Sequence, residues 1–387
     1  MREKVILQDF TVLLVCPSQK WSTIERRVLF DSTLLRNMGC NPVILCYKNS
    51  QIDIEADIED IPRVYISSKL SFYKGTQFLA ELRRLVMEKR FDIIHCYSLF
   101  PLWFSAFILG SHQHIPLFLT YNENIQVKPF SVVSKWLLRR VDFIFTLSKG
   151  VEDFLKDVFP VPPKKLRTLG TAIELGAKKP SEENESPKQI GCVINNLTEL
   201  QKLHFPIKTF RLLKNEYSSE WEHLELFIFL GPRVYQQDRA KDVLTELDYE
   251  FYKGDIHLIS LKGKESRLKE VDIFFGTAFD EPINDYEIAA LISGIPVLFP
   301  RTGMRQSLVH AMGFQAESYF ESDLREAKAK LLILLKNNQV YCKSLENRKQ
   351  EIVNFHGLES YVSKFQKFYE MAYSKRLRLK QKKGAKS

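Results

Sequence analysis

The chain has 387 residues, more than one ordinary hydrophobic core supports, so we expect two domains. Its 45% hydrophobic and 27% charged residues are typical of a globular protein, and the 12% aromatic residues exclude a disordered chain. The formal net charge is +9, but seven basic residues and no acid lie after position 374. Removing those seven from the nine leaves +2 for the rest, so we predict no nucleic-acid partner.

Cysteine usage and the N-terminal residues favour a cytoplasmic protein. The six cysteines form no CxxC spacing, so neither a zinc site nor a redox motif is predicted. Four of them lie in apolar strand-like runs, where free cysteine behaves as a small buried hydrophobe. The opening MREKVILQDF lacks the apolar core of a signal peptide. The longest apolar run, residues 100–109, is about half the ~20 residues that a membrane span needs, so we expect no transmembrane helix.

The first part of the chain alternates between apolar runs and amphipathic stretches. The apolar runs are continuous, which is typical of strands buried on both faces of a parallel sheet. Strands are predicted at Thr11–Cys16, Pro42–Tyr47, Arg63–Ile66, Asp92–Tyr97, Leu117–Tyr121, Asp142–Leu147 and Leu166–Leu169. Helices are predicted between them, for example at Arg26–Met38 and Thr76–Lys89. This alternation predicts an α/β doubly wound domain.

A polar stretch with two prolines, Gly176–Lys188, reads as a linker to a second domain of the same kind. Strands are predicted there at Ile190–Ile194, Leu224–Leu230, Asp255–Leu261, Asp272–Gly276 and Ile295–Phe299. Helices are predicted at Pro206–Lys214, Arg239–Leu247, Asp285–Ser293 and Ser322–Asn337. The last helix, Leu358–Tyr373, has aromatic residues spaced by three and four, which indicates a packing face.

The segment Val271–Val309 resembles the donor-site segment of retaining glycosyltransferases of family 4, also called glycosyltransferase group 1. A strand leads to Glu-Pro, then a helix, then a Gly-x-Pro-Val turn. The matching residues are Asp272, Glu281, Pro282, Gly294, Pro296 and Val297. Other segments follow the family's order, including the strand DIIH at 92–95, the strand DFIFTLS at 142–148 and the turn at 230–232.

The resemblance implies the GT-B fold, in which two Rossmann-like doubly wound domains face each other across a cleft. The implied division is an acceptor-side domain at 1–175, a linker at 176–188 and a nucleotide-sugar donor domain at 189–354. The C-terminal helix at 355–373 would pack back on the first domain, and 374–387 would form a basic tail.

The resemblance also assigns candidate site residues. Glu281 would be the catalytic residue. The donor-binding residues would be Lys202, Asn196, Asn284, Asp285, Gly303, Arg301 and Arg305. The acceptor-side residues would be Asn122, Glu123 and His95. Family members neutralise the diphosphate with basic side chains and a helix N-terminus, so we expect no metal and no cofactor, with the nucleotide-diphosphate sugar as co-substrate.

Several positions depart from the family pattern. The second glutamate of the donor site falls on Ala289, and the nearby Glu287 points about 200° away on a helix. The phosphate-binding arginine reads as Asn195 or Asn196, and the glycine-rich first loop is replaced by Pro17–Thr23, which has no glycine.

Two functions therefore stay open. The first is a hexosyltransferase that moves a sugar, with retention, to a glycan or lipid-linked acceptor in cell-surface polysaccharide synthesis. The second is an inactive GT-B partner or scaffold subunit of a glycosylation complex. A nucleotide-binding or epimerase-like enzyme is a minor variant of the first.

Three further features have a structural and a functional interpretation. His95 ends a buried strand, so a core histidine competes with an acceptor-side role. The His112-x-His114 pair has no carboxylate beside it and reads as surface chemistry. Trp136 with its basic neighbours, and the basic tail, fit either a solvated surface or peripheral contact with an anionic membrane at the inner face of the cell membrane.

Overall fold

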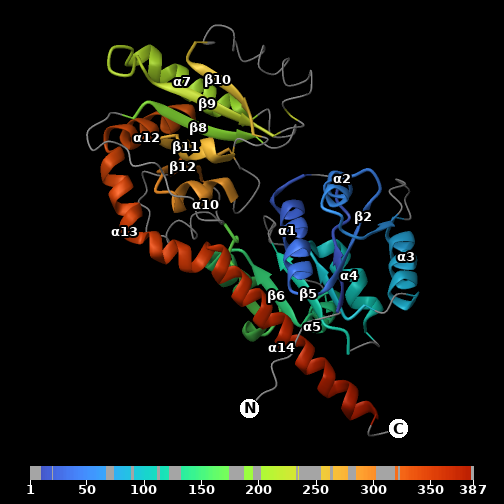
Figure 1. Cartoon of the computed structure of the whole chain (residues 1–387). Coiled ribbons are helices and arrows are strands. Elements are labelled where there is room, and N and C mark those ends of the chain that lie inside the picture. The colour runs from blue at the N-terminus through green and yellow to red at the C-terminus, as the bar shows by residue number, and fades with distance from the viewer. Residues whose placement is uncertain are drawn as a thin grey trace. The chain divides into compact units, whose positions relative to one another are not determined.

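The computed structural model describes residues 10–19, 21–66, 74–88, 91–110, 114–121, 132–173, 187–194, 202–231, 234, 254–261, 265–277, 285–301, 319–320 and 323–384. The chain divides into two compact units (Figure 1). The first unit contains Met1–Gly170 and Tyr361–Ser387, and the second contains Thr171–Ser360.

The first unit is built on a seven-stranded sheet of order β3-β2-β1-β4-β5-β6-β7, in which every pair of neighbours is parallel. Its strands are β1 (Thr11–Val15), β2 (Asn41–Tyr47), β3 (Arg63–Ile66), β4 (Ile93–Cys96), β5 (Leu117–Tyr121), β6 (Phe143–Thr146) and β7 (Leu166–Thr168). All residues of β4 and β5 are buried, as continuous apolar runs predict for a sheet covered on both faces.

Helices connect these strands and make every crossover possible, because parallel strands cannot be joined by a short turn. They are α1 (Thr23–Asn37), α2 (Gln51–Ile58), α3 (Lys74–Glu88), α4 (Leu99–Ile108), α5 (Val132–Arg140), α6 (Lys149–Val158) and the short 3₁₀ helix η1 (Pro163–Lys165). The predicted strand–helix alternation of the first domain is therefore confirmed.

The second unit has a six-stranded sheet of order β10-β9-β8-β11-β12-β13, again parallel at every paired position. Its strands are β8 (Gln189–Ile194), β9 (Glu225–Leu230), β10 (Ile256–Ser260), β11 (Ile273–Phe275), β12 (Val297–Pro300) and β13 (Tyr319–Phe320). Its helices are α7 (His204–Glu216), η4 (Glu265–Lys269), α10 (Asp285–Ile292), α12 (Leu324–Lys336) and α13 (Asn338–His356).

Helices cover both faces of this second sheet. Buried residues of α7 and α12 share one hydrophobic cluster with β8, β9, β11 and β12, whereas α10 packs against α13. Strand β13 and helix α13 were not predicted. The helix predicted at Arg239–Leu247 and most of the predicted linker, 176–186, lie outside the described residues.

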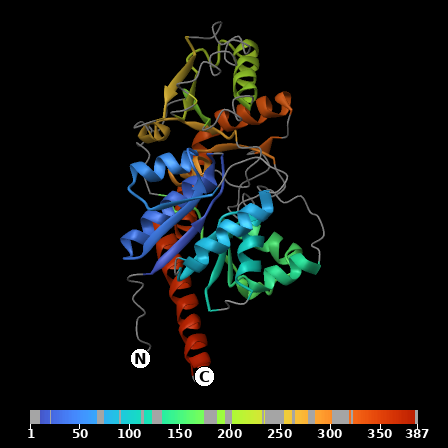
Figure 2. The same ribbon diagram turned by 90° about the vertical axis from the view of Figure 1, so that its right-hand side faces the viewer.

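The last helix, α14 (Leu358–Gly384), continues as one long helix beyond the predicted end at Tyr373 (Figures 1 and 2). Its aromatic side chains Tyr361, Phe365 and Tyr369 are fully buried in the first unit. The Tyr361 hydroxyl donates a 2.6 Å hydrogen bond to Asp31 of α1, and the Tyr369 ring lies 5.0 Å from that of Phe118 in β5. The aromatic face is thus a packing face, as its spacing indicates.

Candidate functional site

In open parallel sheets, ligands bind beyond the carboxyl ends of the strands where the strand order reverses. In the second sheet this reversal lies between β8 and β11, because the chain builds outward from β8 in one direction and from β11 in the other. In the first sheet the same point lies between β1 and β4. These two edges are the places to look for a site in each unit.

At the reversal point of the second sheet, the segment after β11 is tied to β8. The hydroxyl of Thr277, which is buried, donates a 2.7 Å hydrogen bond to the carbonyl oxygen of Val193. Residues 195–201, after β8, and 278–284, after Thr277, lie outside the described ones. Those undescribed segments contain Asn196, Glu281 and Asn284, and Gly303 and Arg305 also lie outside, so these five assignments stay predictions.

Three predicted donor-binding residues are described, and all lie at the carboxyl edge of this second sheet. Lys202 is half-buried in the connection from β8 to α7. Asp285 begins α10, the helix that follows β11. Arg301 follows β12 directly, and its backbone N–H donates to the carbonyl oxygen of Phe320 in β13. The fold therefore brings to one edge residues that are almost a hundred positions apart in the chain.

Glu287, in the first turn of α10, is a buried carboxylate that the sequence argument set aside. Its Oε1 lies over Gly276, at the end of β11, so closely that a Cβ there would be 2.5 Å from it. Glu287 thus points toward the sheet, and Ala289 is only half-buried on the same helix. A glycine just after a strand and a glutamate on the next helix carry no recognisable sequence signal, because the contact depends on how α10 packs.

The corresponding loop of the first unit is closed by its own side chains. The Ser22 hydroxyl accepts a 3.3 Å hydrogen bond from the Ile24 N–H, and Glu25 accepts 2.7 Å and 2.6 Å hydrogen bonds from the Ser22 N–H and hydroxyl. This capping box occupies the helix start that a glycine-rich loop would leave open for a phosphate. In this chain a capping box thus takes the place of the glycine-rich loop.

His95 is a core residue, which corrects its assignment to the acceptor side. It is fully buried, and its Nδ1 and Nε2 lie 2.8 Å from the hydroxyls of Tyr369 and Thr120, respectively. Burial lowers the pKa of His95 to about 3, so the ring is neutral at physiological pH. The two hydrogen bonds of His95 connect β4 to β5 and to α14. The other acceptor-side residues, Asn122 and Glu123, lie outside the described residues.

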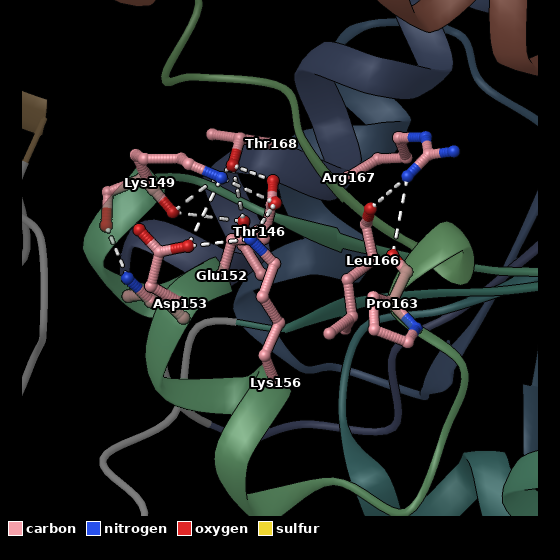
Figure 3. A network of polar contacts seen from close by, with 11 residues as sticks. Thr146, Lys149, Glu152, Asp153, Lys156, Pro163, Leu166, Arg167 and Thr168 are labelled. Atoms are coloured by element: carbon pink, nitrogen blue, oxygen red, sulfur yellow. Dashed lines mark hydrogen bonds and ion pairs between the residues drawn. The ribbon is translucent and has the colours of Figure 1, made fainter.

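A polar network does occupy the carboxyl ends of β6 and β7 (Figure 3). Glu152 of α6 accepts hydrogen bonds from Lys149 at 2.7 Å and from the Thr168 hydroxyl at 2.6 Å, and it pairs with Lys156 at 3.0 Å. Burial opposes the charge of Glu152, but these three donors outweigh it and hold its pKa below the usual value. The network fixes the start of α6 and leaves the Lys149 ammonium partly exposed at this edge. No sequence pattern indicated this network.

Almost the whole chain is similar in structure to known glycosyltransferases. A glycosyltransferase from Rickettsia africae matches with a TM-score of 0.69 and 14% identity, over 94% of this chain and 98% of that one. HepE from Anabaena, in complex with UDP and glucose, matches with a TM-score of 0.66 and 13% identity, over 92% and 98%. MurG from Acinetobacter baumannii matches with a TM-score of 0.61 and 12% identity, over 93% and 98%. This chain has the GT-B fold.

At such low identities the likeness of this GT-B chain to those structures is one of fold. A sequence match adds to it, because residues 24–176 match the family model of Glycosyltransferase Family 4. That segment covers most of the first unit and ends shortly after its boundary. No curated protein sequence matches the chain.

No group of three or more His, Cys, Asp or Glu side chains among the described residues is placed to hold a metal ion. None of the described helices combines the length and the apolar character needed to cross a bilayer.

Proposed function

We propose that this protein is a glycosyltransferase that moves a sugar from a nucleotide-diphosphate sugar to a glycan or lipid-linked acceptor, with retention and without a metal. The observation that carries the proposal is the GT-B fold over almost the full length of the chain, including the likeness to HepE with UDP and glucose bound. The family match over residues 24–176 supports the same class.

The donor would bind at the carboxyl edge of the second sheet, between β8 and β11. A departing diphosphate needs positive charge and free N–H groups in place of a metal. Lys202, Arg301 and Arg305 would supply the charge. The start of α10, at Asn284 and Asp285, would supply the N–H groups, since a helix N-terminus is a seat for phosphate.

The remaining predicted residues would act on the sugar and the acceptor. Glu281 would lie beside the donor sugar as the catalytic residue, with Asn196 and Gly303 completing the donor site. Asn122 and Glu123, after β5 of the first sheet, would contact the acceptor. The transferred sugar would be a hexose, and the product would enter cell-surface polysaccharide.

Nucleotide binding tests the donor site first. Purified protein is titrated by calorimetry with UDP, GDP and their common sugar conjugates. We expect one nucleotide to bind with micromolar affinity, and Glu281→Ala to abolish transfer while nucleotide affinity changes by less than about threefold. Glu220→Ala, an exposed residue in the same unit, serves as the control. If folded protein binds none of these nucleotides, the transferase proposal fails.

A second candidate function is a catalytically inactive partner subunit. It is favoured by Ala289 on α10, where the second glutamate of the donor site is expected, and by Asn195 or Asn196 in place of the arginine. This candidate predicts a stable complex with another glycosyltransferase and no turnover of any sugar nucleotide. Measured transfer by the isolated chain would exclude it.

We further propose that the protein works in the cytoplasm and contacts an anionic membrane at its inner face. The basic residues after position 374 support this contact, since each basic residue near an anionic surface contributes about 1 kcal/mol. All of them except Lys386 lie on α14, which remains helical to Gly384.

A further inference from the structure

A pocket of about 500 Å³ opens at the amino-terminal edge of the first sheet, the edge away from the strand ends where substrates bind. Asp142 directly precedes β6, and Lys165 directly precedes β7. Helices α4, α5 and α14 complete the walls. The lining residues are Ala106, Gly110, Trp136, Arg139, Arg140, Asp142, Lys165 and Lys375. All of them belong to the first unit.

The pocket has more positive charge than its one carboxylate can balance. Four cations and one carboxylate line it, which leaves a formal excess of three positive charges. Asp142 is already shared: its Oδ1 accepts a 2.6 Å hydrogen bond from the Lys375 ammonium, and its Oδ2 lies 3.3 Å from the Arg140 guanidinium. The charges of Arg139 and Lys165 are therefore left without a carboxylate of their own in this pocket.

The excess of positive charge in the pocket affects the pKa of Lys165. Its ammonium donates to the carbonyl oxygens of Arg139 at 2.7 Å and Val141 at 2.6 Å, and its third donor has no hydrogen-bond partner among the described residues. Burial lowers the pKa of Lys165, and the neighbouring cations Lys375 and Arg140 lower it further against the opposing effect of Asp142. An anion in the pocket would relieve this repulsion and use the remaining donor.

Exposed aromatic and apolar side chains lie on the three helices that line the charged pocket. The Trp136 ring lies against Gly110 yet is 53% exposed, and Phe107 at the end of α4 is 61% exposed. Leu377, one residue beyond Arg376 on α14, is also exposed beside the exposed Arg378. Tryptophan next to basic side chains is the combination that occupies the headgroup region of a bilayer, where the ring is partly apolar and the cations meet phosphates.

We propose that this pocket binds the phosphate of an anionic phospholipid, with Arg139, Lys165 and Lys375 contacting the phosphate and with Trp136 and Phe107 entering the headgroup region. The pocket lies at the edge of the sheet opposite the proposed substrate edge, so docking leaves the substrate edge of this sheet uncovered. The inference rests on the membrane contact proposed above and assigns it to one site, and it is independent of whether the chain transfers a sugar.

The test is co-sedimentation with phosphatidylcholine vesicles, with and without phosphatidylglycerol, at constant ionic strength. The double variant Arg139→Ala/Lys375→Ala removes two pocket cations and keeps Arg140 and Lys165, whose side chains hydrogen-bond to backbone carbonyls at this edge. The control Lys48→Ala/Arg83→Ala removes the same charge from exposed positions that do not line the pocket. A third variant ends the chain at Arg378, so that it keeps the pocket and removes the later basic residues. Circular dichroism checks that each variant is folded.

We expect wild type to bind only the vesicles that contain phosphatidylglycerol. The pocket variant should lose about 30-fold in partitioning, because two basic residues contribute about 1 kcal/mol each at an anionic surface. The control should lose less than about threefold.

Three results would overturn the proposal. Equal losses in the pocket variant and the control would show that only net charge matters. Loss confined to the shortened chain would assign the membrane contact to the last residues alone. Saturable binding of inorganic phosphate in calorimetry, without any binding of anionic vesicles, would identify a site for a soluble anion.

Discussion

The free energy of unfolding of the first unit should depend on pH through two buried groups, Asp31 and His95. Their pKa values are shifted in opposite directions. Asp31 is buried beneath α14, where it accepts 2.6 Å hydrogen bonds from the hydroxyls of Tyr97 and Tyr361. Burial raises the pKa of Asp31 to about 6, although Arg27 and the two hydrogen bonds oppose the rise. The neighbouring His95 is shifted the other way, to a pKa of about 3, by burial.

The two shifts have opposite consequences for the free energy of unfolding. Asp31 has a higher pKa folded than unfolded, so its contribution is present below about pH 3.8 and is lost as the pH rises through 6. At ~1.4 kcal/mol per pH unit, this loss amounts to ~3 kcal/mol. His95 has a lower pKa folded than unfolded, so its contribution is present above 6.5 and is lost as the pH falls. Between pH 4 and 6 the two slopes nearly cancel.

Asp31→Asn removes one of the two slopes. We expect the difference in unfolding free energy between wild type and the variant to fall by ~3 kcal/mol from pH 3.5 to pH 7. Within the variant alone, stability should rise by up to ~1.4 kcal/mol per pH unit between pH 4 and 6, as His95 then acts unopposed. His95→Asn should reverse the sign of the slope.

Urea unfolding followed by tryptophan fluorescence measures these differences, because three of the four tryptophans, Trp21, Trp103 and Trp136, lie in the first unit. Asp60→Asn, in an exposed turn, controls for the loss of one carboxylate. A wild-type-minus-variant difference for Asp31→Asn that stays constant within about 0.5 kcal/mol from pH 4 to 7 would refute the reasoning.

Two further predictions concern packing. Gly276→Ala should destabilise the second unit by ~2–3 kcal/mol, since its Cβ would lie 2.5 Å from Glu287 Oε1 and 3.1 Å from the Leu298 carbonyl oxygen. Gly254→Ala, where a Cβ meets no atom within 4 Å, should be neutral or slightly stabilising, and hydrogen exchange of second-unit peptides under urea compares the two. Tyr361→Phe should cost ~1.5–3 kcal/mol, as it removes a hydrogen bond to the buried carboxyl of Asp31, and should increase proteolysis of the α14 segment.

Local sequence patterns predicted the strands well. The twelve predicted strands match twelve observed ones to within two residues at each end, because short continuous apolar runs are typical of strands buried on both faces of a parallel sheet. The exception is β13, whose two residues carry no periodic signal. The length of α14 was underestimated, since the basic residues after Tyr373 read as a solvated tail although they have good helix propensity.

Some features of the candidate site could likewise be predicted from the sequence, and others could not. A donor site at the carboxyl edge of the second sheet, where Lys202, Asp285 and Arg301 lie, was expected from the doubly wound fold. The direction in which a single side chain points could not be predicted from the sequence. His95 could be an acceptor-side residue or a core residue from its sequence context, and only Tyr369, 274 positions later, decides for the core.

By itself the sequence determined two doubly wound α/β domains, an aromatic packing face on the last helix and the family to compare, because these depend on residues that are neighbours along the chain. The tertiary structure alone decided what depends on distant residues. It placed Glu287 over Gly276, joined α14 to Asp31 and His95, and gathered α4, α5, β6, β7 and α14 around one cationic pocket. Burial and electrostatic interactions depend on which residues lie close together in space, and distant residues come together only when the chain folds.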